Sequence, residues 1–275
     1  FFVSTAWLAE HLGAPDLTVV DGTFFMPDEH RSARAEYLAG HILGAVYFDI
    51  DAIADHTTDL PHMLPSPETF ADAMRELGIA ETMRLVVYDA SGLLGAARVW
   101  WTLRLFGAKD VKILTGGLPK WKAEGRKLES GAVARAPRNF SVQFDAGAVA
   151  SAAAVLGASQ SGAAQIVDAR AAPRFRGETP EPRPGLRSGH IPGSFNVPWS
   201  KLVDKGEMRT PADVAVAFAE AGVDLTRPII TTCGSGVSAA ILLLALQTTG
   251  KDGIVLYDGS WAEWGGRVDL PIAQG

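Results

Sequence analysis

The chain contains 275 residues but only one cysteine, Cys233. A single cysteine excludes an internal disulfide and a cysteine-rich metal site within these residues. It also fits a reducing compartment, so we expect a cytoplasmic location, with the matrix of an organelle as the other possibility.

The chain also lacks an excess of positive charge. Its net charge is −6 and its pI is near 5.5, whereas nucleic-acid-binding proteins usually carry a basic patch. The longest uninterrupted apolar run, Ala239 to Leu246, is far shorter than the ~20 residues of a membrane-spanning helix. We therefore expect neither a nucleic acid nor a membrane as a partner.

The first residues, "FFVSTAWLAEHLGAPD", lack the basic and apolar regions and the cleavage site of a secretory signal. We interpret them as mature protein. Because there is no initiator methionine, we expect that a few native residues before Phe1 are missing.

Four sequence blocks recur in the same order in the two halves of the chain. The pairs are "TVVDGTFFMPD" with "QIVDARAAPRF", "GHILGAVYFDID" with "GHIPGSFNVPWS", "LVVYDASGLLGAARVWW" with "PIITTCGSGVSAAILLL", and "VKILTGGLPKW" with "GIVLYDGSWAEW". This pattern indicates a duplicated domain. We predict an N-terminal domain over 1–128, a linker over 129–145 and a C-terminal domain over 146–275.

Each half reads as an alternation of strands and helices. The β-rich runs are Leu17–Val20, Leu85–Tyr88, Val111–Leu114, Gln165–Val167, Pro228–Thr232 and Ile254–Tyr257, and helical patterns cover Pro67–Leu77 and Pro211–Ala221. Such alternation predicts an α/β fold in which each domain has a mainly parallel sheet with helices on both faces.

Cys233 lies on a glycine-bearing loop between a predicted strand and a predicted helix. Gly234 and Gly236 allow the backbone to curl so that successive N–H groups face one point, and the helix N-terminus adds partial positive charge. Such a loop stabilises a thiolate or an anionic sulfur carried on it. The equivalent loop of the first half carries Asp89, so only the second half has a nucleophile. A cleft between duplicated domains is a common place for a site, and the first half could then supply supporting groups.

The loop has two other interpretations. A buried cysteine can simply pack as a small hydrophobic residue, although the glycine and serine context disfavours this. Phosphatase chemistry also uses a cysteine loop before a helix, but it requires an arginine six residues later, where this chain has Ala239.

With these residues in view, the chain resembles the two-domain rhodanese-type sulfurtransferases over nearly its whole length. The loop "CGSGVS" and the blocks "HMLP" and "RFRGETPEPR" are similar to those of the 3-mercaptopyruvate sulfurtransferase branch. Leu43 replaces the proline usual in the first "HIPG" block. Ser238 replaces a common threonine, and we expect it to keep that residue's hydrogen bond in the loop.

The resemblance implies a role for several residues. Cys233 would attack the donor sulfur and become a persulfide, and Arg174 and Arg183 would hold the donor's carboxylate and keto oxygen. Residues implied to line the substrate site are Gly234, Gly236, Val237 and Ser238. Asp51, His62 and Ser235 match the family's proposed proton relay.

Other conspicuous residues are interpreted as structural. His41 and His190 occur in both halves although only one half has the thiol, so we expect them to serve the fold. Trp264 corresponds to Trp121 of the first half, and we expect it in the core.

The resemblance implies an enzyme that transfers sulfur from 3-mercaptopyruvate to acceptor thiols, possibly thioredoxin, or to cyanide, and releases pyruvate. Covalent catalysis of this kind requires neither a metal nor an organic cofactor. Two alternatives stay open, a thiosulfate sulfurtransferase and a non-catalytic sulfur-carrier module. A dianionic thiosulfate would favour charged residues after the cysteine, where this loop has the neutral Gly234 and Ser235.

Overall fold

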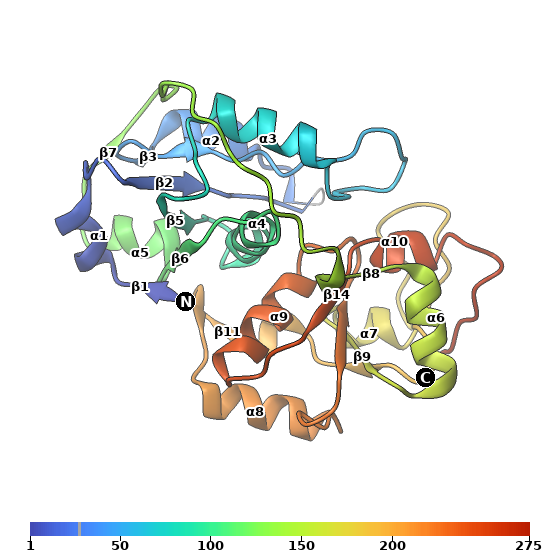
Figure 1. Cartoon of the computed structure of the whole chain (residues 1–275). Helices are drawn as coiled ribbons and strands as arrows, with labels where there is room; N and C mark the ends of the chain where they lie inside the picture. Colours follow the sequence, from blue (N-terminus) through green and yellow to red (C-terminus); the bar gives the residue numbers. More distant parts are fainter. Residues whose placement is uncertain (27–28) are drawn as a thin grey trace. The chain divides into compact units, whose positions relative to one another are not determined.

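The computed structural model describes residues 1–26 and 29–275, which form two compact units (Figure 1). The first unit comprises Phe1–Asp55, Leu64–Asp145 and Lys205–Met208. The second unit comprises His56–Met63, Ala146–Asp204 and Arg209–Gly275. Each unit therefore includes a short segment that belongs to the other half of the sequence.

The first unit contains a five-stranded sheet in the order β1-β6-β5-β2-β4, in which all neighbours are parallel. Its strands are β1 (Phe2–Val3), β2 (Leu17–Asp21), β4 (Val46–Tyr47), β5 (Arg84–Tyr88) and β6 (Asp110–Leu114). Its helices are α1 (Thr5–His11), α2 (Ala33–Ala39), α3 (Pro67–Glu76), α4 (Leu94–Leu105) and α5 (Gly117–Ala123). A short antiparallel pair joins β3 (His41–Ile42) to β7 (Leu128–Glu129).

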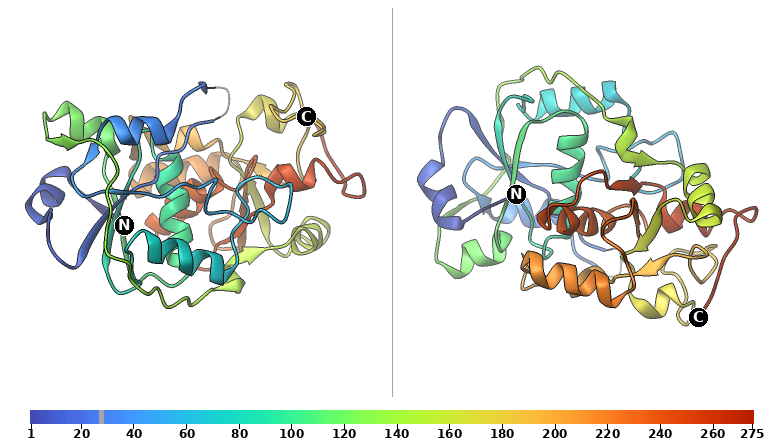
Figure 2. Two further views of the ribbon diagram at one scale, coloured as in Figure 1. Left: turned by 90° about the horizontal axis from the view of Figure 1, so that it is seen from above. Right: turned by 60° about the horizontal axis from the view of Figure 1, so that its bottom comes forward.

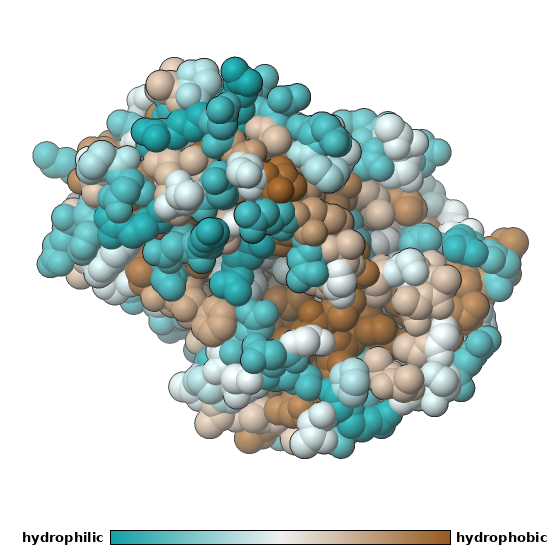
Figure 3. Space-filling model, in the orientation of Figure 1, coloured by the Kyte–Doolittle hydropathy of each residue, from teal (hydrophilic) through white to brown (hydrophobic). Residues whose placement is uncertain are grey.

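Both faces of this sheet are covered. Leu17 and Val19 of β2 pack with Leu8 of α1 and Trp121 of α5 in one apolar cluster. Helix α4 packs against β5 and β6 on the opposite face (Figure 1). The side of α3 that faces away from the core is polar, and hydrophilic residues follow it in the space-filling view (Figure 3).

The second unit repeats this topology, with a parallel sheet in the order β10-β9-β13-β14-β8. Its strands are β8 (Val149–Ala150), β9 (Gln165–Asp168), β10 (Phe195–Asn196), β13 (Ile229–Thr232) and β14 (Val255–Tyr257). Its helices are α6 (Ala152–Ser161), α7 (Ala172–Phe175), α8 (Pro211–Glu220), α9 (Ala239–Thr248) and α10 (Ser260–Trp264), with 3₁₀ turns at Ala146–Ala148 and Trp199–Lys201. A hairpin pairs β11 (Val203–Asp204) with β12 (Glu207–Met208).

Helices cover both faces of the second sheet as well (Figure 2). On one face, Val155 of α6 and Trp264 of α10 pack with Ile166 and Ile230 of the strands. On the other face, α9 contacts β13 and β14. The apolar run over residues 239–246 of α9 is explained by its position, since all of these residues are buried.

The structure confirms the predicted class, two α/β domains of the same topology with helices on both faces of parallel sheets. Each predicted strand and helix agrees with its observed counterpart to within one residue at either end. The helix starts have local causes, because the hydroxyls of Ser66 and Thr210 cap α3 and α8, and both helices have proline in their first turn.

The residues interpreted as structural are buried. The Nδ1 atom of His41 bonds the carbonyl of Tyr37 at 2.8 Å, and Nδ1 of His190 bonds that of Phe175 at 2.9 Å. Each imidazole is stacked on the ring of the same partner. Two equivalent histidines with equivalent bonds support the fold in both units. Trp264 lies in the core, as expected.

Candidate active site

Cys233 occupies the loop between the end of β13 and the start of α9. It is a free cysteine with 2% of its surface exposed. The strand and helix lie on either side of it as the sequence predicted. Ser238 adopts helical backbone angles at the start of α9, but its side chain makes no capping hydrogen bond. The expectation that Ser238 keeps such a bond is therefore wrong.

The two glycines of this loop are needed for different reasons. Gly236 has φ +79°, a left-handed conformation that is unfavourable for other residues. Gly234 does not have such a φ, but a Cβ atom there would lie 3.1 Å from Nη2 of Arg174. The guanidinium group of Arg174 is thus adjacent to the backbone that follows the cysteine.

Ser260 stabilises the cysteine loop by hydrogen bonds. This residue was not identified from the sequence. Its buried Oγ accepts hydrogen bonds from the N–H groups of Cys233, at 3.2 Å, and Gly236, at 3.1 Å. It donates to the carbonyl of Tyr257 at 2.8 Å and lies 4.0 Å from Sγ of Cys233. A difference between the two repeats could have identified Ser260 from the sequence. The block "YDGS" ends in this serine, where the equivalent position of the first half is Gly117. Both residues have positive φ, +48° and +55°.

The equivalent loop of the first unit shows which group its backbone N–H groups can surround. The carboxylate of Asp89 accepts the N–H groups of Leu93, at 3.0 Å, and Ala96, at 2.9 Å, as well as the hydroxyl of Ser91 at 3.1 Å. Burial raises the pKa of Asp89, while these hydrogen bonds act in the opposite direction. In the second unit the amide of Val237 is equivalent to that of Leu93, and no residue that the structure describes accepts a hydrogen bond from it.

This comparison defines the chemistry available to Cys233. The same loop surrounds a carboxylate in the first unit and a sulfur atom in the second. Backbone N–H groups that converge on one point form an anion-binding nest. Of the two amides that Asp89 receives, the loop of the second unit offers an anionic sulfur the equivalent of one, that of Val237, because the amide of Ala240, equivalent to that of Ala96, donates to the carbonyl of Val237 at 3.2 Å.

Arg174 and Arg183 both belong to the second unit. Arg174, in α7, donates from Nη2 to Oε2 of Glu181 at 2.5 Å, and 22% of its side chain is exposed. Arg183 donates from Nη2 to Nε2 of His62 at 3.1 Å. A guanidinium can only donate, so this contact requires a neutral His62 ring with its proton on Nδ1.

His62 reaches Arg183 because His56–Met63 is part of the second unit although it comes from the first half of the sequence. It is 9% exposed and has φ +61°. Ser235 is buried on the cysteine loop, with 6% exposure. Asp51 is exposed and belongs to the first unit, so the predicted relay of Asp51, His62 and Ser235 stays a prediction.

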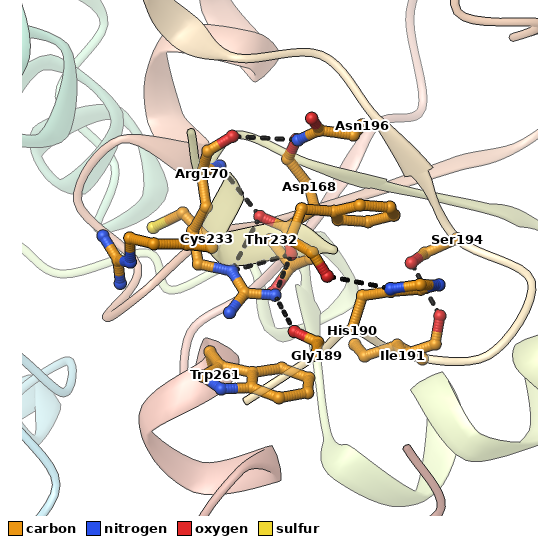
Figure 4. A network of polar contacts seen from close by, with 12 residues as sticks. Asp168, Arg170, Gly189, His190, Ile191, Ser194, Asn196, Thr232, Cys233 and Trp261 are labelled. Carbon is orange, nitrogen blue, oxygen red and sulfur yellow. Dashed lines mark hydrogen bonds and ion pairs between the residues drawn. The ribbon is translucent and has the colours of Figure 1, made fainter. Parts of the chain in front are cut away.

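A network of buried polar contacts lies beside the cysteine (Figure 4). The guanidinium of Arg170 bonds Asp168 and the carbonyl of Gly189, and it lies 4.2 Å from the ring centroid of Trp261. Trp261 in turn donates its backbone N–H to the carbonyl of Cys233 at 2.9 Å. The network thus connects the strand end of β9 to the cysteine loop.

The described residues, 1–26 and 29–275, contain neither a candidate metal site nor a candidate membrane span. No group of three or more His, Cys, Asp and Glu side chains is placed to hold a metal ion in this part of the chain. None of the helices described has the length and apolar character needed to cross a bilayer.

Comparisons with known proteins agree with the two-domain fold. A model of the rhodanese-like domain matches the chain twice, over residues 4–124 and 151–267. The 3-mercaptopyruvate sulfurtransferase of Escherichia coli (strain K12) is 51% identical over 273 residues, which cover 99% of this chain and 97% of that protein. A mitochondrial thiosulfate/3-mercaptopyruvate sulfurtransferase of Arabidopsis thaliana is 40% identical and is covered to 77%, with 98% of this chain aligned. The crystal structure of a 3-mercaptopyruvate sulfotransferase from Escherichia coli superposes with a TM-score of 0.89 and 49% identity, covering 94% of this chain and 98% of that one.

Proposed function

Since this chain belongs to the family of proteins built from rhodanese-like domains, we propose that it is an enzyme that transfers sulfur from 3-mercaptopyruvate through a persulfide on Cys233. One observation carries the assignment of the nucleophile. Cys233 stands on an amide-lined loop whose counterpart in the first unit holds the carboxylate of Asp89. Hydrogen bonds donated by such a loop would favour the anionic forms of sulfur that the reaction requires, as those to Asp89 act to lower its pKa against the effect of burial.

In the first half-reaction the thiolate of Cys233 attacks the sulfur of the donor. A new S–S bond forms, and the C–S bond of the donor breaks with its electron pair going to carbon. The enolate of pyruvate takes up a proton and leaves as pyruvate. Cys233 then carries one additional sulfur atom, and covalent catalysis of this kind gives ping-pong kinetics.

In the second half-reaction a nucleophile attacks the outer sulfur of the persulfide. The S–S bond breaks, and the thiolate of Cys233 is regenerated. We propose small thiols and thioredoxin as acceptors, and cyanide as an acceptor that would yield thiocyanate. Because thiol acceptors must be reduced, we propose the cytoplasm or an organelle matrix as the location.

The remaining predicted site residues fit roles around this chemistry. Arg174 and Arg183 would bind the carboxylate and keto oxygen of the donor, since guanidinium groups suit planar oxyanions. The amides of Gly234, Val237 and Ser238 would face the transferred sulfur, whereas the amide of Gly236 is already bonded to Oγ of Ser260 and would shape the loop. His62, whose Nε2 already accepts a hydrogen bond, would exchange protons with the donor together with Asp51 and Ser235.

Thiosulfate is the competing donor, and the name of the Arabidopsis relative includes both donors. The absence of charged side chains at Gly234 and Ser235 favours the monoanionic mercaptopyruvate over the thiosulfate dianion. Comparing kcat/KM for the two donors decides between them, and a higher value with thiosulfate would reverse the choice. If no pyruvate were released from mercaptopyruvate, a carrier role without turnover would be favoured.

The direct test is an intact-protein mass spectrum after incubation with 3-mercaptopyruvate. We expect a gain equal to the mass of one sulfur atom, accompanied by one pyruvate per chain. Treatment with cyanide should remove the gain. The Cys233→Ser variant is nearly isosteric, so it should fold normally and gain no sulfur, and equal sulfur loading of this variant would exclude Cys233 as the carrier.

A further inference from the structure

Four charged side chains of the second unit form a continuous chain of alternating sign. Arg170 bonds Asp168 with Nη2 to Oδ2 at 2.7 Å, and its Nη1 donates to Oε1 of Glu181 at 2.8 Å. The other oxygen of Glu181, Oε2, accepts Nη2 of Arg174 at 2.5 Å. Oε1 of Glu181 also accepts Nε of Arg174 at the longer distance of 3.4 Å, so the two arginines share this carboxylate.

This series of four side chains extends from the interior of the second unit to the cysteine loop. The side chains of Asp168, Arg170 and Glu181 are each 1% exposed, whereas 22% of the side chain of Arg174 is exposed. Arg170 is further fixed by the carbonyl of Gly189 (Figure 4). At the outer end, Nη2 of Arg174 lies 3.1 Å from the position that a Cβ of residue 234 would occupy.

We propose that Glu181 is a positioning residue that holds the guanidinium of Arg174 beside the cysteine loop before the donor arrives. The proposal rests on the proposed function, in which Arg174 binds the donor. A long arginine side chain loses considerable rotamer freedom when it is ordered. A carboxylate that has already ordered it lowers this cost for the incoming donor.

The geometry also determines which part of Arg174 the donor can meet. Nη2 and, at 3.4 Å, Nε of Arg174 both face Glu181. Its Nη1 group has no acceptor among the residues that the structure describes. The Nη1 group of Arg174 would therefore donate the hydrogen bonds to the donor's oxyanion. The edge of the guanidinium with Nε and Nη2 would hold the arginine in place.

The variant Glu181→Gln removes this arrangement with little change in volume. An amide has one acceptor oxygen, so its NH₂ group must face one of the two guanidinium groups, and two donors then oppose each other. The guanidinium of Arg170 keeps its bonds to Asp168 and the carbonyl of Gly189, whereas the side chain of Arg174 has no other hydrogen bond among the described residues. Arg174 is therefore the side chain that is released.

A matched control exists in the same loop. Glu178 forms an equivalent two-bond contact with Arg176, at 2.6 and 2.7 Å, but this pair is exposed. Glu178→Gln therefore removes the same charge and the same type of contact without touching Arg174. It should leave the kinetics unchanged.

The experiment measures steady-state kinetics with 3-mercaptopyruvate for the wild type, Glu181→Gln, Glu178→Gln, Arg174→Ala and the double variant of Arg174 and Glu181. We expect Glu181→Gln to raise KM roughly three- to tenfold with a smaller change in kcat. In the Arg174→Ala background the same substitution should cause no further loss, because Glu181 acts through Arg174. The discharge of a preloaded persulfide to cyanide should be unaffected, because the donor has already left.

Two results would overturn the proposal. One is an unchanged KM in Glu181→Gln, and the other is an effect of full size in the Arg174→Ala background, which would indicate a purely structural role. If Glu181→Gln does not fold, the variant Glu181→Asp provides the test, since it keeps the charge but cannot reach both arginines. An unchanged KM in Glu181→Asp would then reject the positioning role of Glu181. Failure of the wild type to release pyruvate would instead reject the proposed function.

Discussion

The substitution Gly234→Ala places a methyl group between the cysteine loop and Arg174. The backbone of Gly234 does not have positive φ, so alanine fits its conformation without strain. The equivalent residue of the first unit is already an alanine, Ala90, in a loop without the thiol. The stability of the protein should therefore stay the same or rise by about 0.4–1 kcal/mol.

The effect on catalysis should be of the opposite sign. The new Cβ would lie 3.1 Å from Nη2 of Arg174, whereas ordinary contacts are 3.4–4 Å, so the guanidinium must move by a few tenths of an ångström. A misplacement of about 1 Å can cost about a hundredfold in rate, so this smaller shift should lower kcat/KM roughly three- to tenfold.

The assay follows pyruvate release at several concentrations of 3-mercaptopyruvate, together with thermal unfolding of the same preparations. Gly157→Ala in α6 is the control, because a Cβ there meets nothing within 4 Å. It should leave activity unchanged and raise stability slightly. Full activity of Gly234→Ala would refute the reasoning, because the close approach of Arg174 would then be irrelevant to the donor. A loss of stability equal to the loss of activity would also refute it.

Two further predictions concern the paired loops. Gly236 and Gly92 have φ +79° and +77°, so alanine at either position should lower the free energy of unfolding by about 1–2 kcal/mol. Only Gly236→Ala should impair sulfur transfer. An equal loss of activity in Gly92→Ala would contradict the assignment of the cysteine loop as the active site. Because burial raises the pKa of Asp89, the folded protein binds this proton more readily than the unfolded chain, so the associated stability is present in acid and is lost as the pH rises through the folded-state pKa. Asp89→Asn should weaken this pH dependence of urea unfolding above about pH 4, and an unaltered dependence would argue against it.

The sequence by itself determined the elements of the fold and the location of the proposed nucleophile. Strand boundaries were visible as β-rich runs, and helix starts were visible at Ser66-Pro67 and Thr210-Pro211, because these signals act between neighbouring residues. The duplication appeared as repeated blocks. The loop around Cys233 could be identified for the same reason, since glycine spacing and the following apolar helix are local features.

The tertiary structure alone decided which distant side chains contact one another in the candidate site. Ser260 bonds Cys233 across 27 positions of the chain, and His62 contacts Arg183 across 121. Glu181 is an ordinary charged residue in its sequence, and its role follows only from its burial between two arginines. Contacts of this kind depend on how distant segments pack, and no local pattern of residues encodes them.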